Sequence, residues 1–243
     1  VNPNDLLFVS DVAVVLNAAT DGCVYSYTEQ MKGGFITIGH GIRIGIAGEY
    51  VTSGDSVTTI KSITSLNIRI PHDVRGCSKS VCKIFSELGL KNTLLYSRPG
   101  LGKTTMLRDI ALTLSCDDGR NVLIFDERGE IAAMDGYGEG FDLGAVDVVR
   151  CFSKKAAIAS AIRAMKPGVI ITDELYGESD ISAVRYAADC GIVIIASSHV
   201  TDKRILKEMP FDYYVELNSI GGQPRIYDKD FNTYSAGGVD DCG

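Results

Sequence analysis

Isoleucines on alternate positions dominate the first part of the chain. In FITIGHGIRIGIAG, residues 35–48, they occupy every second position on both sides of a Gly-His-Gly turn at 39–41. This period is typical of paired strands with one buried face. The segment SLNIRIP, residues 65–71, predicts a further strand. Its inward positions are expected to be Leu66, Ile68 and Ile70.

Helical spacing of apolar residues appears on either side of these strands. Short helices are expected over residues 5–19 and 24–32, and a further one over 78–88, where apolar residues lie three or four positions apart. Mixed helices and antiparallel strands predict a small α+β domain over residues 1–76. The chain starts at Val1 rather than Met, so we expect it to be trimmed at this end.

From residue 93 onward, short apolar runs alternate with segments of helical spacing. The runs are rich in β-branched residues and occupy 93–96, 121–126, 169–172 and 193–197. Such runs suit strands that are covered on both faces. Strands that alternate with helices predict a parallel sheet with right-handed crossovers. We therefore expect an α/β domain over residues 77–243, ending in two edge strands at 213–217 and 224–228.

The strongest motif, SRPGLGKTT, stands between a predicted strand and a predicted helix. A phosphate-binding loop needs small residues, so that successive backbone N–H groups can converge on an anion. Its lysine would serve the β- and γ-phosphates, and its first threonine would serve Mg²⁺. A glycine-rich turn that binds nothing is the alternative. The residues expected to contact ATP are Ser97, Arg98, Pro99, Gly100, Leu101, Gly102, Lys103, Thr104 and Thr105.

One position departs from the usual pattern of such loops. Ser97 stands where the loop normally opens with glycine. Serine is small enough for this place if its backbone φ angle is negative. The departure therefore predicts a working loop with lowered affinity.

An acidic pair ends the strand VIITDE, about 70 residues after the loop. The carboxyl ends of parallel strands share one edge of the sheet, so the pair should lie near the loop. Asp173, with Thr104, is expected to hold Mg²⁺, and Glu174 to orient and deprotonate the attacking water. An acidic pair that only caps a helix is the alternative.

Two further groups follow predicted strands. FDERGE carries Asp126, Glu127 and Glu130, and IIASSH ends on His199. Both should face the same edge of the sheet, where Glu130 and His199 could act on the phosphates. A solvated turn and a structural histidine are the alternatives. Arg43 and Arg69, on the polar faces of the N-terminal strands, could supply a cation to the transition state, although surface arginines are common.

Composition restricts the partners. The formal net charge is −7, so we expect no nucleic-acid partner. Seven scattered cysteines indicate reduced thiols in a cytoplasmic protein. No apolar run approaches the roughly 20 residues of a membrane span. Any membrane association is therefore expected to be peripheral and to depend on partner proteins.

Taken in order, six segments resemble a known family. They are GGFITIGHGIRIGIAG, SLNIRI, PGLGKTT, FDERGEIA, AIRAMKPGVIITDE and IIASSH. The sequence is similar in them to the stage III sporulation protein AA family of endospore-forming bacteria, which is related to the type II and type IV secretion and pilus ATPases. The resemblance implies a RecA-like P-loop ATPase domain with a mainly parallel sheet, behind a smaller α+β domain.

The resemblance also implies roles for particular residues. FDERGE corresponds to the family's aspartate box and Ser198-His199 to its histidine box. Arg43 and Arg69 fall where secretion relatives present arginines to the nucleotide, and Arg163 matches a recurring arginine. Residues 134–155 keep only a partial likeness. The implied assembly is a hexameric ring that acts with membrane proteins of a channel between mother cell and forespore, from the mother-cell cytoplasm.

The function that these observations predict is an ATP-hydrolysing motor. A nucleotide-binding scaffold with little or no hydrolysis is the alternative, favoured by Ser97. A small-molecule kinase is disfavoured because the sequence has no arginine-dense lid. A GTP-dependent switch is disfavoured because the Asn-Lys-x-Asp motif that reads guanine is absent.

Overall fold

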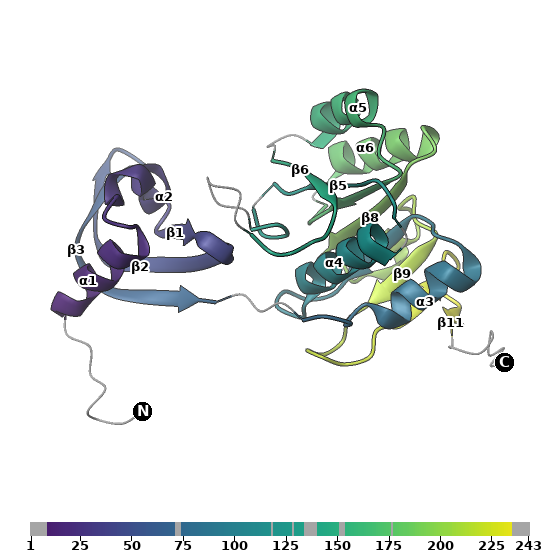
Figure 1. Ribbon diagram of the computed structural model, residues 1–243, viewed down its shortest axis with the longest axis horizontal. Coiled ribbons are helices and arrows are strands. Elements are labelled where there is room, and N and C mark those ends of the chain that lie inside the picture. Colours follow the sequence, from purple (N-terminus) through teal and green to yellow (C-terminus); the bar gives the residue numbers. More distant parts are fainter. Residues whose placement is uncertain are drawn as a thin grey trace. The chain divides into compact units, whose positions relative to one another are not determined.

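Two compact units make up the chain (Figure 1). The computed structural model describes residues 9–70, 74–117, 119–127, 129–133, 140–150, 154–175 and 177–234. The smaller unit comprises residues 1–72 and 133–141, and the larger one residues 73–132 and 142–243. The domain boundary predicted after residue 76 stays a prediction, because compactness alone does not define a folding domain.

The smaller unit is a three-stranded antiparallel sheet covered by short helices. Its sheet has the order β1-β2-β3, and Ile36 pairs with Ile44 as the alternating isoleucines predict. One face buries a core formed by Leu16, Ile36, Ile44, Ile46 and Ile60. The elements are α1 (Val9–Ala19), a 3₁₀ turn (Val24–Tyr27), α2 (Thr28–Lys32), β1 (Phe35–Ile38), β2 (Ile42–Ser53) and β3 (Ser56–Arg69).

Three expectations for this unit need correction. The helix predicted over 24–32 is a 3₁₀ turn followed by a single short α-helix. The strands β2 and β3 continue into a long hairpin that the sequence did not predict, with Val51 paired to Thr59. Ile68 and Ile70 are 48% and 63% exposed rather than inward. Ile68 shares a face with buried Ile44, but it lies on the edge strand, which has a neighbour on one side only.

The larger unit contains a sheet of eight strands in the order β11-β10-β9-β4-β8-β7-β5-β6. Strands β9, β4, β8, β7, β5 and β6 are parallel, and β10 and β11 are antiparallel additions. The bounds of the strands are β4 (Thr93–Tyr96), β5 (Val122–Phe125), β6 (Val146–Val149), β7 (Val169–Thr172), β8 (Val193–Ser198), β9 (Tyr213–Glu216), β10 (Arg225–Asp228) and β11 (Thr233–Tyr234). The predicted α/β class with a mainly parallel sheet is confirmed.

Helices follow β4, β6, β7 and β8 along the chain, and the central strands are buried on both faces. Every residue of β4, β5 and β7 is buried, as their continuous apolar sequences predict. Ile158 of α5 and Ile181 of α6 pack in one cluster with the sheet residues Leu94 and Ile170. The helices are α3 (Lys79–Leu88), α4 (Lys103–Leu112), which continues into a π-helical turn (η3, Thr113–Asp117), α5 (Lys154–Met165), α6 (Glu178–Asp189) and α7 (Lys203–Leu206).

Two features of the sheet differ from expectation. The strands predicted at its edge, β9 and β10, each have neighbours on both sides. Strand β6, with the sequence VDVV, was not predicted because Asp147 interrupts a run that is only half-buried. The order of the central strands has a functional consequence. Strands β4, β8, β7 and β5 are adjacent and parallel, so the segments that follow them meet at one edge of the sheet.

Candidate functional site

The glycine-rich loop joins β4 to α4, as predicted. Gly100 and Gly102 have φ angles of +80° and +91°, which residues with a side chain rarely adopt. A Cβ atom built on either glycine would meet no atom within 4 Å, so the space beside the loop is open. Gly102 stands at the N-terminus of α4, where backbone N–H groups are free to meet an anion. The loop therefore fits a bound phosphate chain.

Ser97 adapts to the first position of the loop without strain. It is not among the non-glycine residues of the described chain that have a positive φ angle, and its side chain is buried. Its hydroxyl donates to the carbonyl of Arg98 over 2.8 Å and lies 3.2 Å from Lys103 Nζ, from which it accepts. The serine thus satisfies the condition of a negative φ angle and adds a contact to the loop lysine.

Lys103 is the most deeply placed charge of the loop, with 6% of its surface exposed. Its ammonium group lies 3.1 Å from the carbonyl oxygen of Ser97 and 2.8 Å from Nδ1 of His199. Burial lowers the pKa of Lys103 to about 8, and the negative charge of Glu174 opposes that shift. The ammonium group is therefore held at the loop, and its pKa lies close to neutral pH.

His199 links this lysine to an acidic residue of the next strand. Its Nε2 lies 2.9 Å from Oε1 of Glu174, whose side chain is 15% exposed. A charged lysine can only donate, so Nδ1 accepts from Lys103, and the ring proton is assigned to Nε2, from which Glu174 accepts. Three predicted site residues, one at the start of α4 and two that follow β8 and β7, therefore form one hydrogen-bonded chain.

Asp173 and Thr104 lie at the same edge of the sheet. Asp173 directly follows β7 and is 6% exposed, and Thr104 is the second residue of α4. The backbone N–H of Leu175 donates to the carbonyl of Ser197 over 2.9 Å, which fixes the acidic segment against β8. A carboxylate and a hydroxyl are suitable oxygen donors for Mg²⁺ beside phosphates. Their role as a Mg²⁺ site stays a prediction.

Of the acidic residues that follow β5, one binds backbone N–H groups and another lies at the surface. Asp126 is buried, and its carboxylate accepts from the N–H groups of Glu130 and Ala132, each over 2.8 Å. Glu130 itself is exposed. Asp126 therefore shapes the loop that presents Glu130. A role for Glu130 at the phosphates stays a prediction.

The two N-terminal arginines occupy facing positions in the smaller unit. Arg43 of β2 pairs with Arg69 of β3 in the antiparallel register, and the Arg43 guanidinium lies 3.7 Å from the centre of the Phe35 ring. Two positive side chains on facing positions repel each other, so an anion bound beside them would reduce that repulsion. Their assignment to a nucleotide stays a prediction, as do the roles of Arg98, Pro99, Leu101 and Thr105.

Sequence reasoning missed two buried charges on α4. Arg108 and Asp109 are 7% and 5% exposed. Both stand in MLRDIAL, where helical spacing places them on the side opposite the apolar positions of the predicted helix. Charged residues are almost never fully buried unless they are paired, but the burial of these two comes from tertiary contacts, so no local signal in the sequence could have identified them.

The chain resembles known proteins in its sequence. Residues 8–219 match the family described as "Sporulation stage III, protein AA". The chain belongs to this family. It is 33% identical to stage III sporulation protein AA of Bacillus subtilis, over 96% of this chain and 82% of that protein. It is also 32% identical to the uncharacterized protein ycf45 of Cyanidium caldarium, over 61% of this chain and 44% of the relative.

Solved structures show the same fold at low sequence identity. The ATPase DotB of Legionella pneumophila superposes with a TM-score of 0.57 at 15% identity, covering 85% of this chain and 63% of DotB. The pilus retraction motor PilT with bound ADP gives 0.52 at 16% identity, covering 86% of this chain and 68% of PilT. The fold of this sporulation protein AA family member is therefore that of the P-loop secretion ATPases.

Within the described residues, no helix combines the length and apolar character needed to cross a membrane.

Proposed function

We propose that this sporulation protein AA family member hydrolyses ATP. The observation that carries the proposal is the chain of hydrogen bonds from Lys103 through His199 to Glu174, beside an open glycine loop. It connects a phosphate-binding cation to a carboxylate suited to activate water. The P-loop ATPase fold and the ADP bound to PilT support nucleotide as the ligand.

Each residue receives a role from its position. The loop amides and Lys103 would bind the phosphates, and Thr104 with Asp173 would hold Mg²⁺. The cation, when bound, would neutralise charge on the phosphate oxygens. Glu174 would accept the proton of the attacking water, and His199 would keep Glu174 oriented toward the phosphate end of the loop. Glu130, Arg43 and Arg69 would add polar and cationic contacts to the nucleotide.

The biological setting is proposed from the family. The relative that matches over most of the chain is named for sporulation, and two solved structures of similar fold are named as an ATPase and a pilus retraction motor. We infer a mechanochemical ATPase that acts as a ring, expected to be hexameric. It would energise a channel complex from the mother-cell cytoplasm through membrane-protein partners, and bind no nucleic acid.

Parallel measurement of binding and turnover tests the proposal. ATP binding, phosphate release and molecular mass would be followed with and without Mg²⁺-ATP, for the wild type and Lys103→Ala. The proposal requires binding, release and a larger assembly in the wild type, with binding and release lost in the variant. Binding without release would favour the scaffold alternative. Phosphate appearing on an acceptor instead of in solution would favour a kinase.

A further inference from the structure

The chain passes between its two units three times, and each passage is attached to the same helix. The larger unit begins at residue 73, is left after residue 132 and is re-entered at residue 142. The described residues next to these passages are 74–78 (the entry segment), 129–132 (the exit segment) and 142–144 (the return segment). Side chains of α4 or of its extension η3 hold all three segments inside the larger unit.

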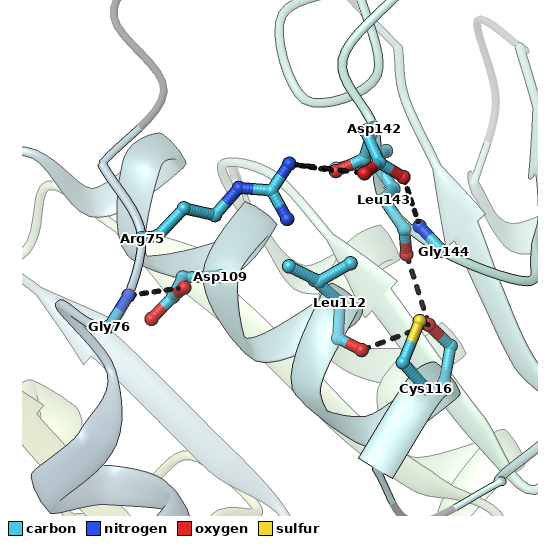
Figure 2. A network of polar contacts seen from close by, with 9 residues as sticks. Arg75, Gly76, Asp109, Leu112, Cys116, Asp142, Leu143 and Gly144 are labelled. Carbon is cyan, nitrogen blue, oxygen red and sulfur yellow. Dashed lines mark hydrogen bonds and ion pairs between the residues drawn. The ribbon is translucent and has the colours of Figure 1, made fainter.

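Asp109 of α4 holds the entry segment. Its carboxylate accepts from the N–H of Gly76 over 2.8 Å, from the N–H of Ser78 over 2.7 Å and from the hydroxyl of Ser78 over 2.6 Å. Ser78 is the N-cap residue of α3 and makes no capping hydrogen bond with its own side chain. The carboxylate of one helix therefore satisfies the start of another and fixes the segment between them. Figure 2 shows its contact with Gly76.

The charge of Asp109 is maintained despite burial. Burial alone would raise its pKa, but the hydrogen bonds from Ser78 and Gly76 outweigh it, and the pKa lies below its usual value. Hydrogen bonds to an ionised carboxylate are about twice as strong as those between neutral groups. The entry segment is thus held by an ionised carboxylate at neutral pH.

Arg108, the neighbouring residue on α4, holds the exit segment. Its Nε donates to the carbonyl of Ile131 over 2.9 Å, and its Nη2 donates to the carbonyl of Glu130 over 2.7 Å. Asp126 binds the N–H groups of the same segment, as described above. The exit segment is therefore fixed between α4 and the end of β5.

The return segment packs on the C-terminal end of the same helix. The hydroxyl of Ser115 in η3 donates to the carbonyl of Leu143 over 3.0 Å. A Cβ atom on Gly144 would collide with Ser115 Oγ and Cys116 Sγ, so the backbone approaches η3 as closely as glycine permits. Arg75 of the entry segment also donates to the carbonyl and the carboxylate of Asp142, which ties entry to return (Figure 2).

We propose that α4 is the common anchor of the three passages, and that Arg108 and Asp109 are positioning residues that couple nucleotide binding to the N-terminal unit. This inference rests on the proposed function, which places phosphates at Lys103 and Thr104. Arg108 follows Lys103 by five residues, about 7.5 Å along a helix that moves as a rigid body. A displacement of α4 on binding would therefore move all three segments together.

Backbone hydrogen exchange, followed by mass spectrometry on the full chain, tests this coupling. Wild type, Asp109→Asn and the matched control Asp189→Asn, an exposed position at the end of α6, would each be measured with and without Mg²⁺ and a non-hydrolysable ATP analogue. In the wild type and the control, the analogue should change exchange in the loop 97–105 and in the three segments together. In Asp109→Asn, exchange at Gly76 and Ser78 should rise at least about tenfold.

The proposal is decided by how hydrogen exchange changes when the ATP analogue binds. The proposal requires Asp109→Asn to bind the analogue within about threefold of the wild-type affinity and to protect the loop, while the entry segment no longer responds. A merely structural role would leave that response intact. If the wild-type loop responds and the three segments do not, the coupling is wrong and the proposed function stands. If the wild-type loop does not respond, the proposed function fails, and the coupling with it.

Discussion

Nε2 of His199 lies 2.9 Å from Oε1 of Glu174, and Nδ1 of the same ring lies 2.8 Å from Nζ of Lys103. One imidazole thus separates the group proposed to activate water from the group proposed to bind phosphate. Its two nitrogens contact a carboxylate that follows β7 and an ammonium group at the start of α4, which the adjacent strands β4, β8 and β7 bring together. A change in the charge of Lys103 should therefore alter the electrostatic environment of Glu174, and a change at Glu174 should alter that of Lys103.

Replacing Glu174 by Gln should stop turnover and leave nucleotide binding. The amide keeps the size of the side chain and can still accept from His199, but it cannot take a proton. We expect phosphate release to fall by about 100-fold or more, the usual contribution of a general base. Nucleotide affinity from titration calorimetry should change little. Glu178→Gln, an exposed position on α6, is the control. Turnover at the wild-type rate in Glu174→Gln would contradict the assignment of the base.

Replacing His199 should lower the maximal rate more than the affinity. His199→Ala removes both hydrogen bonds of the ring, and we expect kcat to fall about tenfold or more, the factor expected for losing a hydrogen bond to a charged group. His199→Gln can still donate to Glu174 and should recover part of that loss. Steady-state kinetics measures kcat and KM separately. A raised KM with an unchanged kcat would mean that His199 binds nucleotide instead of positioning Glu174.

Nucleotide affinity should weaken as the pH rises through about 8. Burial lowers the pKa of Lys103 to about 8, so above that pH the lysine loses the charge that attracts phosphate. Affinity for ADP should therefore be nearly constant between pH 6.5 and 7.5 and fall by up to about tenfold per pH unit above 8. Calorimetry in buffers of different ionisation enthalpy should show proton uptake on binding in that range.

Lys103→Arg supplies the control for this pH dependence. An arginine keeps its charge throughout the range, so any affinity that it retains should not vary with pH between 7 and 9.5. A wild-type affinity that stays constant over the same range would contradict the lowered pKa of Lys103 as the cause.

Local patterns predicted the larger unit well because each of its central strands is covered on both faces. The runs at β4, β5 and β7 are mostly apolar and buried throughout, and the loop at 97–105 falls between strand and helix as expected. The same reasoning gave a wrong prediction for Ile68. Its alternation matches that of buried Ile44, but its exposure depends on being at the edge of a sheet, which no local pattern specifies.

The candidate site shows the same division. The loop and the acidic pair after β7 are recognisable from neighbouring residues alone. The bridge from His199 to Lys103 joins residues 96 positions apart in the sequence and depends on the strand order. Asp109 likewise contacts Ser78, 31 positions earlier. Tertiary structure decides such pairings, and Asp109 lies on the side of α4 opposite its apolar positions, so the sequence contains no local sign that it is buried.

The pH dependence of stability offers a separate test of the Asp109 contacts. The pKa of Asp109 is lower in the folded protein than its usual value of about 4. A carboxyl group with a lowered folded pKa stabilises the fold above its unfolded pKa, and this contribution is lost as the pH falls through the folded pKa. Wild-type stability should therefore include an Asp109 contribution at pH 7 that diminishes below pH 4.

Asp109→Asn removes that contribution at every pH. An amide offers one acceptor oxygen in place of two, so at least one donor among Gly76 and Ser78 loses its partner. We expect the free energy of unfolding at pH 7 to fall by about 1–3 kcal/mol. The difference from wild type should shrink as the pH falls from 5 to 3, measured by urea unfolding. Asp189→Asn should differ from wild type by less than about 0.5 kcal/mol at pH 7. A difference between Asp109→Asn and wild type that stays constant down to pH 3 would show that packing, not the charge of the carboxylate, holds the entry segment on α4.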